Sequence, residues 1–218
     1  MQLLHDSGFP ERALPVSCGI DISRYQREVT HNDRPTALFV GRLDEEKRVG
    51  EFLRALARVP AAVGEIVGDG TCRSEWEKLA QDLGITDRVR FHGFVSEDEL
   101  LDAYARCDLF VMPGVAELQS LATMEAMAAG KPVIAANAMA LPHLVHSGRN
   151  GWLFEPGDVN QLTQRLHTLV HDAPLRTRMG AASREIISRH ALAATLQRFE
   201  ELYAQAMGRT APVTALAA

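Results

Sequence analysis

The stretch DLFVMPGVAELQSLATMEAMAAGKPVIAA, residues 108–136, reads as a strand, a loop, a helix and a second strand in succession. The apolar runs at 108–112 and 132–136 have the length of strands buried on both faces of a sheet. The segment between them, from about 119 to 129, is rich in alanine, so we expect a helix that lies close against the sheet. A helix between two short buried strands predicts a βαβ unit and therefore a parallel sheet.

The same alternation extends along most of the chain. Further strands are expected at 36–41 (TALFVG), 62–68 (AVGEIVG), 88–92 (RVRFH) and 150–155 (NGWLFE), and further helices near 48–58, 73–83 and 97–106. Asp158 and Asp172 are placed like the N-caps of two later helices. The sequence therefore predicts an α/β fold with a doubly wound, Rossmann-like parallel sheet. At the front of the chain, residues 14–17 predict one additional strand.

Composition excludes several classes of protein. The 218 residues carry a formal net charge of −5 and a pI near 5.9, whereas a nucleic-acid binder is expected to be basic. No apolar run approaches the ~20 residues of a membrane span, and the N-terminus lacks the pattern of a signal peptide. Three cysteines, an odd number outside metal-ligand spacing, indicate reduced thiols and a cytoplasmic location. Arginines at 176–198 could touch an anionic membrane, but interspersed glutamates favour a solvated helix face.

The loops after the strands hold the candidate binding residues, because ligands of open parallel sheets bind outside the carboxyl ends of the strands. Arg42 and Lys47 follow the first of these strands and could converge on a phosphate. The alternative is a solvated loop in which they pair with the acidic residues at 44–46. Gly68 and Gly70 allow close backbone approach, but the third glycine of a dinucleotide fingerprint is missing, so a nicotinamide cofactor is not expected.

The helix after Glu117 offers a second binding feature. Its N-terminus presents free N–H groups and the positive end of the helix dipole, which suits a diphosphate. Glu125 lies within this apolar helix and needs a partner, either a sugar or ribose hydroxyl or a structural partner such as a backbone amide or an arginine. The chain has no Asp-x-Asp pair for a divalent metal, so positive side chains would hold a leaving diphosphate. His143 and His146 lack a third ligand, which favours surface positions.

Six segments in order resemble the C-terminal domain of family 4 retaining glycosyltransferases, a group with the GT-B fold. They are CGID at 18–21, GRLDEEKR at 41–48, VGDGTCR at 67–73, RVRFHGFV at 88–95, AELQSLATMEAMAAGKPVIA at 116–135 and NGWLFEPGD at 150–158. The resemblance implies transfer of a hexose from a nucleotide-diphosphate sugar with retention of configuration and without a metal cofactor. UDP-glucose is the first expectation for the donor, and GDP-mannose is nearly as well supported.

The resemblance also implies roles for single residues. Arg42, Lys47 and Glu117 are expected to be catalytic, the first two at the donor diphosphate and Glu117 orienting the donor sugar. Glu125 is expected to hold the ribose. The remaining residues expected to bind the nucleotide sugar are Gly41, Gly70, Phe94, Val95, Gln119, Ser120 and Leu121. Phe94 and Val95 belong to the segment whose backbone reads the base.

Two departures from the family pattern affect these expectations. Leu118-Gln119-Ser120 stands where many members have Gly-Phe-Gly, which changes how closely the backbone approaches phosphate and brings Gln119 towards the sugar. The sequence ELQSLATMEAM is similar to a variant found in some glycolipid synthases, including diacylglycerol glucosyltransferases. This similarity points to a lipid acceptor, with a sugar acceptor as the alternative, and to a peripheral association of the full-length enzyme with a membrane.

The length of the chain predicts an incomplete enzyme. We expect residues 1–34 to be the remnant of an N-terminal acceptor domain with its linker, 35–207 to be the nucleotide-sugar-binding domain, and 208–218 to be a disordered tail. The isolated chain is then expected to be inactive, and to form a homodimer through its N-terminal strand or its final helix at about 191–207. The alternatives are a non-catalytic nucleotide-sugar-binding module and a GT-B-like sugar-nucleotide epimerase.

Overall fold

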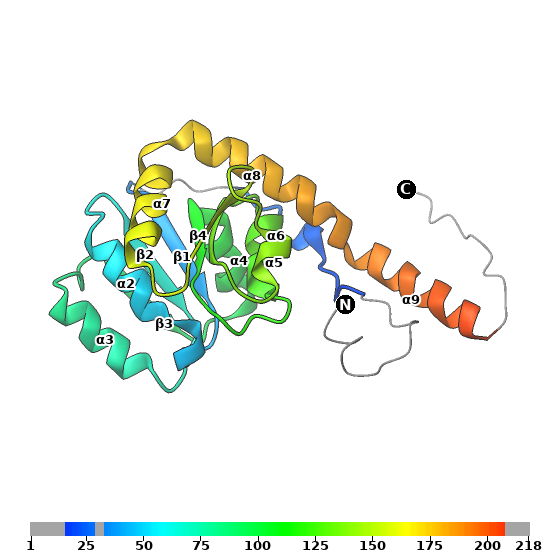
Figure 1. Cartoon of the computed structure of the whole chain (residues 1–218), viewed down its shortest axis with the longest axis horizontal. Coiled ribbons are helices and arrows are strands. Elements are labelled where there is room, and N and C mark those ends of the chain that lie inside the picture. Colours follow the sequence, from blue (N-terminus) through cyan, green and yellow to red (C-terminus); the bar gives the residue numbers. More distant parts are fainter. Residues whose placement is uncertain (1–15, 29–32, 208–218) are drawn as a thin grey trace. The chain divides into compact units, whose positions relative to one another are not determined.

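The computed structural model describes residues 16–28 and 33–207, and its central feature is a parallel sheet (Figure 1). The strand order is β3-β2-β1-β4-β5-β6, and every neighbouring pair is parallel. The strands are β1 Thr36–Val40, β2 Val63–Val67, β3 Val89–Gly93, β4 Leu109–Met112, β5 Val133–Ala136 and β6 Gly151–Phe154. All six match the strands predicted between residues 36 and 155, and the doubly wound α/β class is confirmed.

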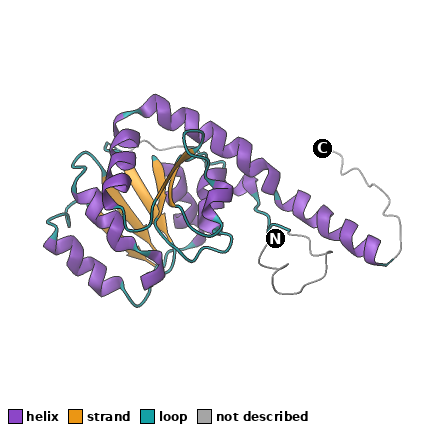
Figure 2. Cartoon of the chain, viewed as in Figure 1, coloured by secondary structure: helices purple, strands orange, loops and turns teal. Residues whose placement is uncertain are grey.

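Helices cover both faces of this sheet (Figure 2). The helices of this part of the chain are α2 Val49–Ala57, α3 Arg73–Asp82, α4 Glu97–Arg106, α5 Leu121–Ala128, α6 Leu141–Leu144, α7 Val159–His171 and α8 Ala173–Ile187. Helix α2 contacts α3 and α7 on one face, whereas α4 lies on β1 and α5 on β4 and β5. The two groups are on opposite faces because the strand order reverses between β1 and β4 and each parallel crossover is right-handed.

The core consists of strands that are buried on both faces. β4 and β5 are buried along their whole lengths, and β1 is buried at four of its five positions. The charged exception Glu65, in β2, is paired with Arg106, whose Nη2 lies 2.7 Å from Glu65 Oε2. Continuous burial explains why the apolar runs in the sequence lack the alternation of a half-exposed strand.

Side-chain caps fix where three of the described helices begin, α4, α7 and α8. Ser96 forms a capping box with Glu99 at the start of α4. Asp158 and Asp172 accept hydrogen bonds from the third residues of α7 and α8, as predicted from the sequence. Helix α5 begins at Leu121, two residues later than predicted, because Ser120 has a left-handed backbone with φ 54° and cannot continue a helix.

Three cationic side chains cap the C-termini of helices at the amino ends of the strands. Ligands of such sheets bind at the opposite, carboxyl ends. Lys131 Nζ donates to Ala105 O at the end of α4 at 2.7 Å, and Arg184 Nη2 donates to Ala129 O at the end of α5 at 3.1 Å. Arg176 Nη1 donates to the carbonyls of Leu169 and Val170 in the last turn of α7. These residues line a cavity of ≈ 410 Å³. The cations compensate the negative ends of the helix dipoles there, which offsets the cost of burying Lys131.

Contacts divide the chain into two compact units. The larger is Ile22–Arg189, and the smaller comprises Met1–Asp21 and His190–Ala218. In the described part of the smaller unit, Ile20 forms a parallel bridge with Ala191, ahead of helix α9 at Leu192–Ala206. Residues 14 and 15 of the predicted strand lie outside the described residues. Val16 and Ser17 are not in a strand, because the pairing is confined to Ile20.

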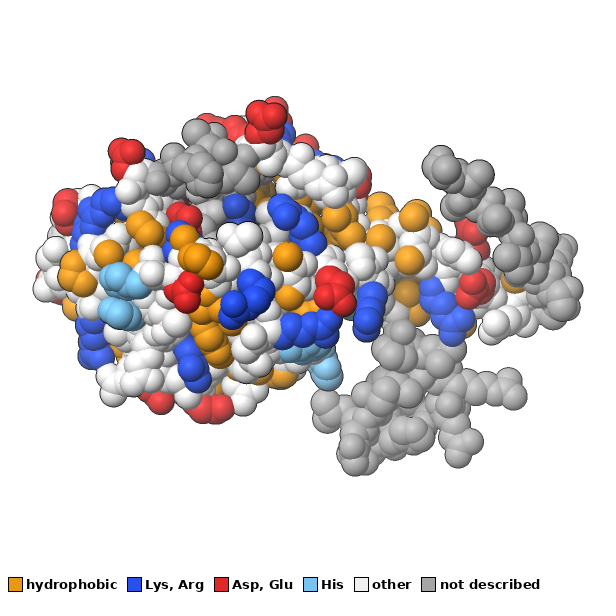
Figure 3. Space-filling view, turned by 90° about the horizontal axis from the view of Figure 1, so that it is seen from above, with side chains coloured by type: hydrophobic (Ala, Val, Ile, Leu, Met, Phe, Trp, Pro, Cys, Tyr) orange, Lys and Arg blue, Asp and Glu red, His pale blue; other side chains and the backbone are white. Residues whose placement is uncertain are grey.

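The surface of the structure carries charges of both signs. On the face seen in Figure 3, lysine and arginine side chains are interspersed with aspartates and glutamates. Within residues 16–28 and 33–207, no helix has the length and apolarity to cross a membrane. The predicted domain limits at 34, 35 and 207 stay predictions, and the expected tail at 208–218 lies outside the described residues.

Candidate nucleotide-sugar site

The site is centred on the reversal of strand order between β1 and β4. At such a point the loops after the two central strands diverge and leave a crevice at their carboxyl ends. The loop after β1 carries Arg42 and Lys47, and the loop after β4 carries Glu117. These are the three residues predicted to be catalytic, and the topology brings their loops side by side. Val115 N donates to Glu46 O at 2.9 Å and joins the two loops directly.

Lys47 and Glu117 form a direct ion pair between Nζ and Oε1. The pair is largely removed from water, since 16% of the Lys47 side chain and 8% of the Glu117 side chain are exposed. Gly114 makes room for it, because a Cβ at this position would lie 3.2 Å from Glu117 Oε1 and 3.4 Å from Lys47 Cδ. Two of the predicted site residues therefore neutralise each other in the ligand-free protein.

Arg42 has the opposite environment, with 72% of its side chain exposed. Its guanidinium pairs with Asp44 at 2.7 Å and with Glu46 at 3.3 Å, which is the pairing expected for a solvated loop. Hydrogen bonds from the backbone and side chain of Thr71 lower the pKa of Asp44, so this carboxylate stays ionised beside Arg42. A phosphate would have to compete with these surface pairs, which are individually weak. The role of Arg42 at the diphosphate stays a prediction.

Glycine is required at position 70 because two loops pack closely there. A Cβ there would lie 2.6 Å from the backbone of Leu43, so only glycine allows the loop at 68–72 to meet the loop at 41–44. Leu43 N donates to Asp69 O at 2.9 Å, and Cys72 N donates to Leu43 O at 2.7 Å. The two loops are therefore hydrogen-bonded to each other along their length.

A pocket of ≈ 270 Å³ opens next to these loops and gathers four of the predicted residues. The lining residues are Val40, Gly41, Arg42, Val67, Gly68, Asp69, Gly93, Phe94, Val95 and Leu100. Phe94 stands out because 85% of its surface is exposed, which is unusual for so large an apolar side chain. Gly70 is absent from this lining among the described residues. Asp69 and Leu100 were not predicted, and Leu100 comes from α4, whose face the sequence pattern does not assign to a pocket.

The start of α5 presents backbone donors. Among the described residues it has no side-chain cap, because Ser120 Oγ is directed to Thr123 Oγ1 at 2.8 Å instead. Ser120 is buried and Leu121 is exposed. The first N–H groups of a helix lack acceptors within the helix, so the N–H groups at Leu121 and just after it are suited to an anion. Gln119 is half-buried beside them.

Glu125 has partners that the sequence did not indicate. Tyr104 Oη donates to Glu125 Oε2 at 2.7 Å. The Tyr25 hydroxyl lies near the same carboxylate, and burial together with the charge of Glu125 raises the pKa of this phenol. The expected need for a partner is thus met by two phenols rather than by an amide or an arginine. Tyr25 lies in the short helix η1, Ile22–Tyr25, within the segment expected to be a linker. The one feature of the sequence that could have indicated this role is that Tyr25 is an aromatic residue in an otherwise polar stretch.

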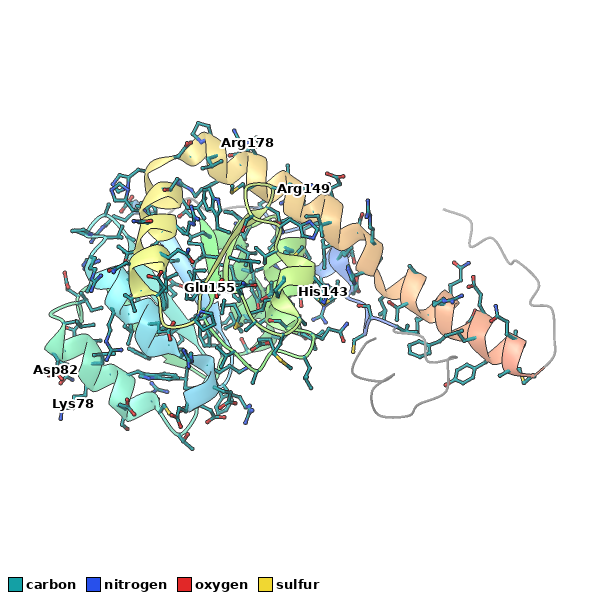
Figure 4. The ribbon with its side chains drawn as sticks, in the orientation of Figure 1. Lys78, Asp82, His143, Arg149, Glu155 and Arg178 are labelled. Atoms are coloured by element: carbon teal, nitrogen blue, oxygen red, sulfur yellow. The ribbon has the colours of Figure 1, made fainter. Side chains whose placement is uncertain are left out.

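The remaining candidate ligands are dispersed. His143, labelled in Figure 4, lies exposed on α6, and His146 is exposed after it, as predicted. Cys18 is exposed, Cys72 is half-buried and Cys107 is buried, and all three are free thiols. Over the described ranges 16–28 and 33–207, the His, Cys, Asp and Glu side chains form no group of three that could hold a metal ion.

Comparisons with known proteins can be set beside this geometry. The profile of the family described as Glycosyl transferases group 1 matches residues 21–186. Sulfoquinovosyl transferase SQD2 of Arabidopsis thaliana is 36% identical over 156 residues, covering 70% of this chain and 30% of that protein. The GDP-mannose-dependent alpha-(1-6)-phosphatidylinositol monomannoside mannosyltransferase of Mycobacterium tuberculosis (strain ATCC 25618 / H37Rv) is 34% identical over 167 residues. That match covers 72% of this chain and 43% of the mycobacterial protein.

A solved structure resembles the chain over most of its length. HepE of Anabaena, in complex with UDP-glucose, matches with a TM-score of 0.84 and 25% sequence identity. The match covers 94% of this chain and 61% of that one. The matched region thus spans less than half of the length of the two curated relatives and less than two thirds of the solved structure.

Proposed function

Because the chain belongs to the family described as Glycosyl transferases group 1, we propose that it is the donor-binding half of a retaining, metal-independent glycosyltransferase. Its substrate is a nucleotide-diphosphate sugar from which a hexose passes to an acceptor. The observation that carries the proposal is that two loops lie side by side at the reversal of strand order: one carries Arg42 and Lys47, and the other leads to the uncapped start of α5. These groups supply fixed positive charge to a leaving diphosphate, the part that a metal ion plays in other transferases.

Each part of the donor has candidate contacts. The base lies against the pocket that contains Gly41, Phe94 and Val95, with the Gly70 loop as its support. The ribose diol binds Glu125, and Glu117 and Gln119 orient the sugar. The diphosphate lies between Arg42, Lys47 and the N–H groups that follow Ser120 and Leu121. The N–H groups at the start of α5 are fixed and stabilise developing negative charge without reorganising, which favours departure of the nucleotide. Arg42 and Lys47 first exchange their acidic partners for the diphosphate.

UDP-glucose is the proposed donor, on the ground that HepE was solved with UDP-glucose bound. GDP-mannose is the main alternative, since the mycobacterial relative is named as dependent on it. That relative's name also includes phosphatidylinositol, and a lipid acceptor is therefore proposed over a free sugar. A lipid acceptor implies that the full-length enzyme works in the cytoplasm and associates peripherally with a membrane surface.

The acceptor is proposed to bind a second half of the enzyme, as in a GT-B fold. Helix α9 carries a row of exposed apolar residues at one-face spacing: Leu192, Leu196, Phe199, Tyr203 and Met207. Exposed apolar stripes of this kind are covered by other protein surfaces. The proposal is that the acceptor half covers this stripe, and that a second copy covers it when the chain is studied by itself. Sedimentation of the purified chain, with Phe199→Lys as the comparison variant, tests the second statement.

Donor binding is tested by calorimetric titration of the chain with UDP, GDP and ADP. Arg42→Ala is expected to weaken binding of the diphosphate by ~1.5–3 kcal/mol, because it removes a charge-assisted contact. Arg149→Ala is the matched control, since Arg149 is another exposed arginine, paired with Glu185 on the surface (Figure 4). Equal affinities for the wild type and both variants would return the 41–48 loop to the solvated-charge interpretation.

Transfer is tested with radiolabelled donor and mixed lipid and sugar acceptors. We expect the 218-residue chain to bind donor without transferring it, because every proposed contact addresses the donor and none holds an acceptor in register. Holding two reactants together is worth up to ~7–11 kcal/mol of a reaction barrier. Robust turnover by this chain without a partner would contradict the proposal, and release of an epimerised donor would favour the epimerase alternative.

A further inference from the structure

Glu125 is the meeting point of three separate elements. Its carboxylate lies on α5, Tyr104 reaches it from α4, and Tyr25 reaches it from η1. Tyr104 Oη is also 3.3 Å from Ala122 O on the first turn of α5. The Tyr104 hydroxyl is therefore directed at α5, whose N-terminus is part of the candidate diphosphate site.

The position of the Tyr104 hydroxyl is fixed by packing. Tyr104 is fully buried, and its ring lies edge-on to Tyr25 with centroids 5.8 Å apart and tilted against Phe110 at 6.0 Å. Burial, together with the charge of Glu125, raises the pKa of both tyrosines, so both hydroxyls keep their protons. A protonated phenol held this firmly serves as a hydrogen-bond donor to the carboxylate.

Ion pairs on both sides of Tyr25 in the sequence hold its segment against α4. Arg24 pairs with Glu97. Arg27 contacts Asp98 at 2.7 Å and Asp102 at 2.6 Å, so both arginines are anchored on α4. Each exposed pair is weak alone, but together they hold residues 22–28 against the helix that also bears Tyr104. Tyr25 and Tyr104 therefore lie beside Glu125 on two elements that are fixed to each other.

An ionised carboxylate has about four lone-pair sites, and two phenols occupy only half of them. Glu125 is half-buried, so the residue is not fully enclosed by the protein. A vicinal diol needs two acceptor positions in a fixed orientation, and such an orientation requires a carboxylate whose rotamer is locked by neighbouring groups.

We propose that Tyr25 and Tyr104 are positioning residues that orient Glu125 to read the ribose diol of the donor nucleotide. The inference rests on the proposed function, because it deepens the role given there to Glu125. It assigns a part in substrate recognition to the 22–28 segment. In this arrangement the hydroxyls act through Glu125 and do not themselves touch the nucleotide.

The test compares UDP with 2′-deoxy-UDP by calorimetry in the wild type, Tyr25→Phe, Tyr104→Phe and Glu125→Gln. The wild type is expected to bind UDP about tenfold more tightly than 2′-deoxy-UDP. Each phenylalanine variant is expected to lose most of this preference, while its affinity for 2′-deoxy-UDP changes less than about twofold. Glu125→Gln should lose the same preference. Tyr203→Phe is the matched control, because Tyr203 is exposed on α9.

Different outcomes of this experiment test the positioning role of the tyrosines and the proposed function separately. A wild-type preference that persists in both phenylalanine variants overturns the positioning role and leaves the donor site standing. A parallel loss of affinity for UDP and 2′-deoxy-UDP in these variants shows a merely structural role and overturns it as well. Failure of the wild type to bind UDP, GDP or ADP would instead overturn the proposed function. Tyr25→Phe keeps the test valid if Tyr104→Phe fails to fold, because Tyr25 is half-buried whereas Tyr104 is fully buried.

Discussion

Lys47 and Glu117 lie 70 residues apart in the sequence and touch at the carboxyl ends of the two central strands. The pair is a consequence of topology, since the loops after β1 and β4 are neighbours only in a sheet whose strand order reverses there. Its side chains are far less exposed than that of Arg42, which pairs with Asp44 and Glu46 on the neighbouring surface. A ligand that engages either residue must therefore affect the other.

We expect Lys47→Met and Glu117→Gln each to lower the free energy of unfolding by about 3 kcal/mol, because each leaves a partner charge buried without compensation. The double variant Lys47→Met/Glu117→Gln should cost less than the sum, by about 1–3 kcal/mol. Urea unfolding of all four proteins measures this coupling. Strict additivity would show that the two side chains do not interact in solution.

Ser120 provides a test of backbone strain. A left-handed conformation is costly for a residue with a Cβ, by roughly 1–2 kcal/mol, and Ser120 recovers part of this through its contact with Thr123. Ser120→Gly should be close to neutral, because it removes both the strain and the contact. Ser120→Ala should destabilise the protein by about 1 kcal/mol more than Ser120→Gly. Thermal melts of the two variants give the order, and the reverse order would show that strain is not the dominant factor.

The buried Lys131 should matter for stability although it lies far from the proposed donor contacts. Lys131→Met removes the cation at the end of α4 and leaves Ala105 O unpaired, which is expected to cost about 1–3 kcal/mol. Lys78→Met is the control, because Lys78 is exposed on α3 (Figure 4) and surface changes stay within about 0.5 kcal/mol. Denaturant midpoints with unchanged slopes measure both. Affinity for UDP should be the same in all three proteins.

The buried phenols predict a loss of stability in alkali. The folded-state pKa of Tyr104 and Tyr25 lies above the unfolded value of about 10, so the unfolded chain releases these protons first as the pH rises. Their contribution is fully present below about pH 10 and is lost above it. The wild type should therefore lose more stability than Tyr104→Phe between about pH 8 and pH 10.5. Cys107, whose pKa burial raises to about 12, contributes equally in both proteins and cancels in the difference. Identical pH profiles would contradict the prediction.

The parallel sheet could be predicted from the sequence because its strands are short apolar runs separated by helical patterns. The nearness of the 41–48 loop to Glu117 follows from the same reasoning, since both come after central strands. The partners of Glu125 could not be found this way. Tyr104 and Tyr25 come from elements whose orientation depends on tertiary packing, and residues 22–28 resemble a polar linker until they are seen against α4. The left-handed backbone of Ser120 also could not be predicted, because a serine in the sequence gives no indication of this conformation.

The loops at 41–44 and 68–72, hydrogen-bonded through Leu43, bear on how this protein can change its substrate over evolution. This pairing braces the backbone that presents Arg42, whereas Phe94 and Leu100 line the pocket beside it. Replacements at Phe94 or Leu100 are expected to reshape the pocket proposed for the base without moving the charges proposed for the diphosphate. Under the proposed donor contacts, single substitutions in this pocket are expected to change nucleotide preference while the proposed diphosphate contacts are retained.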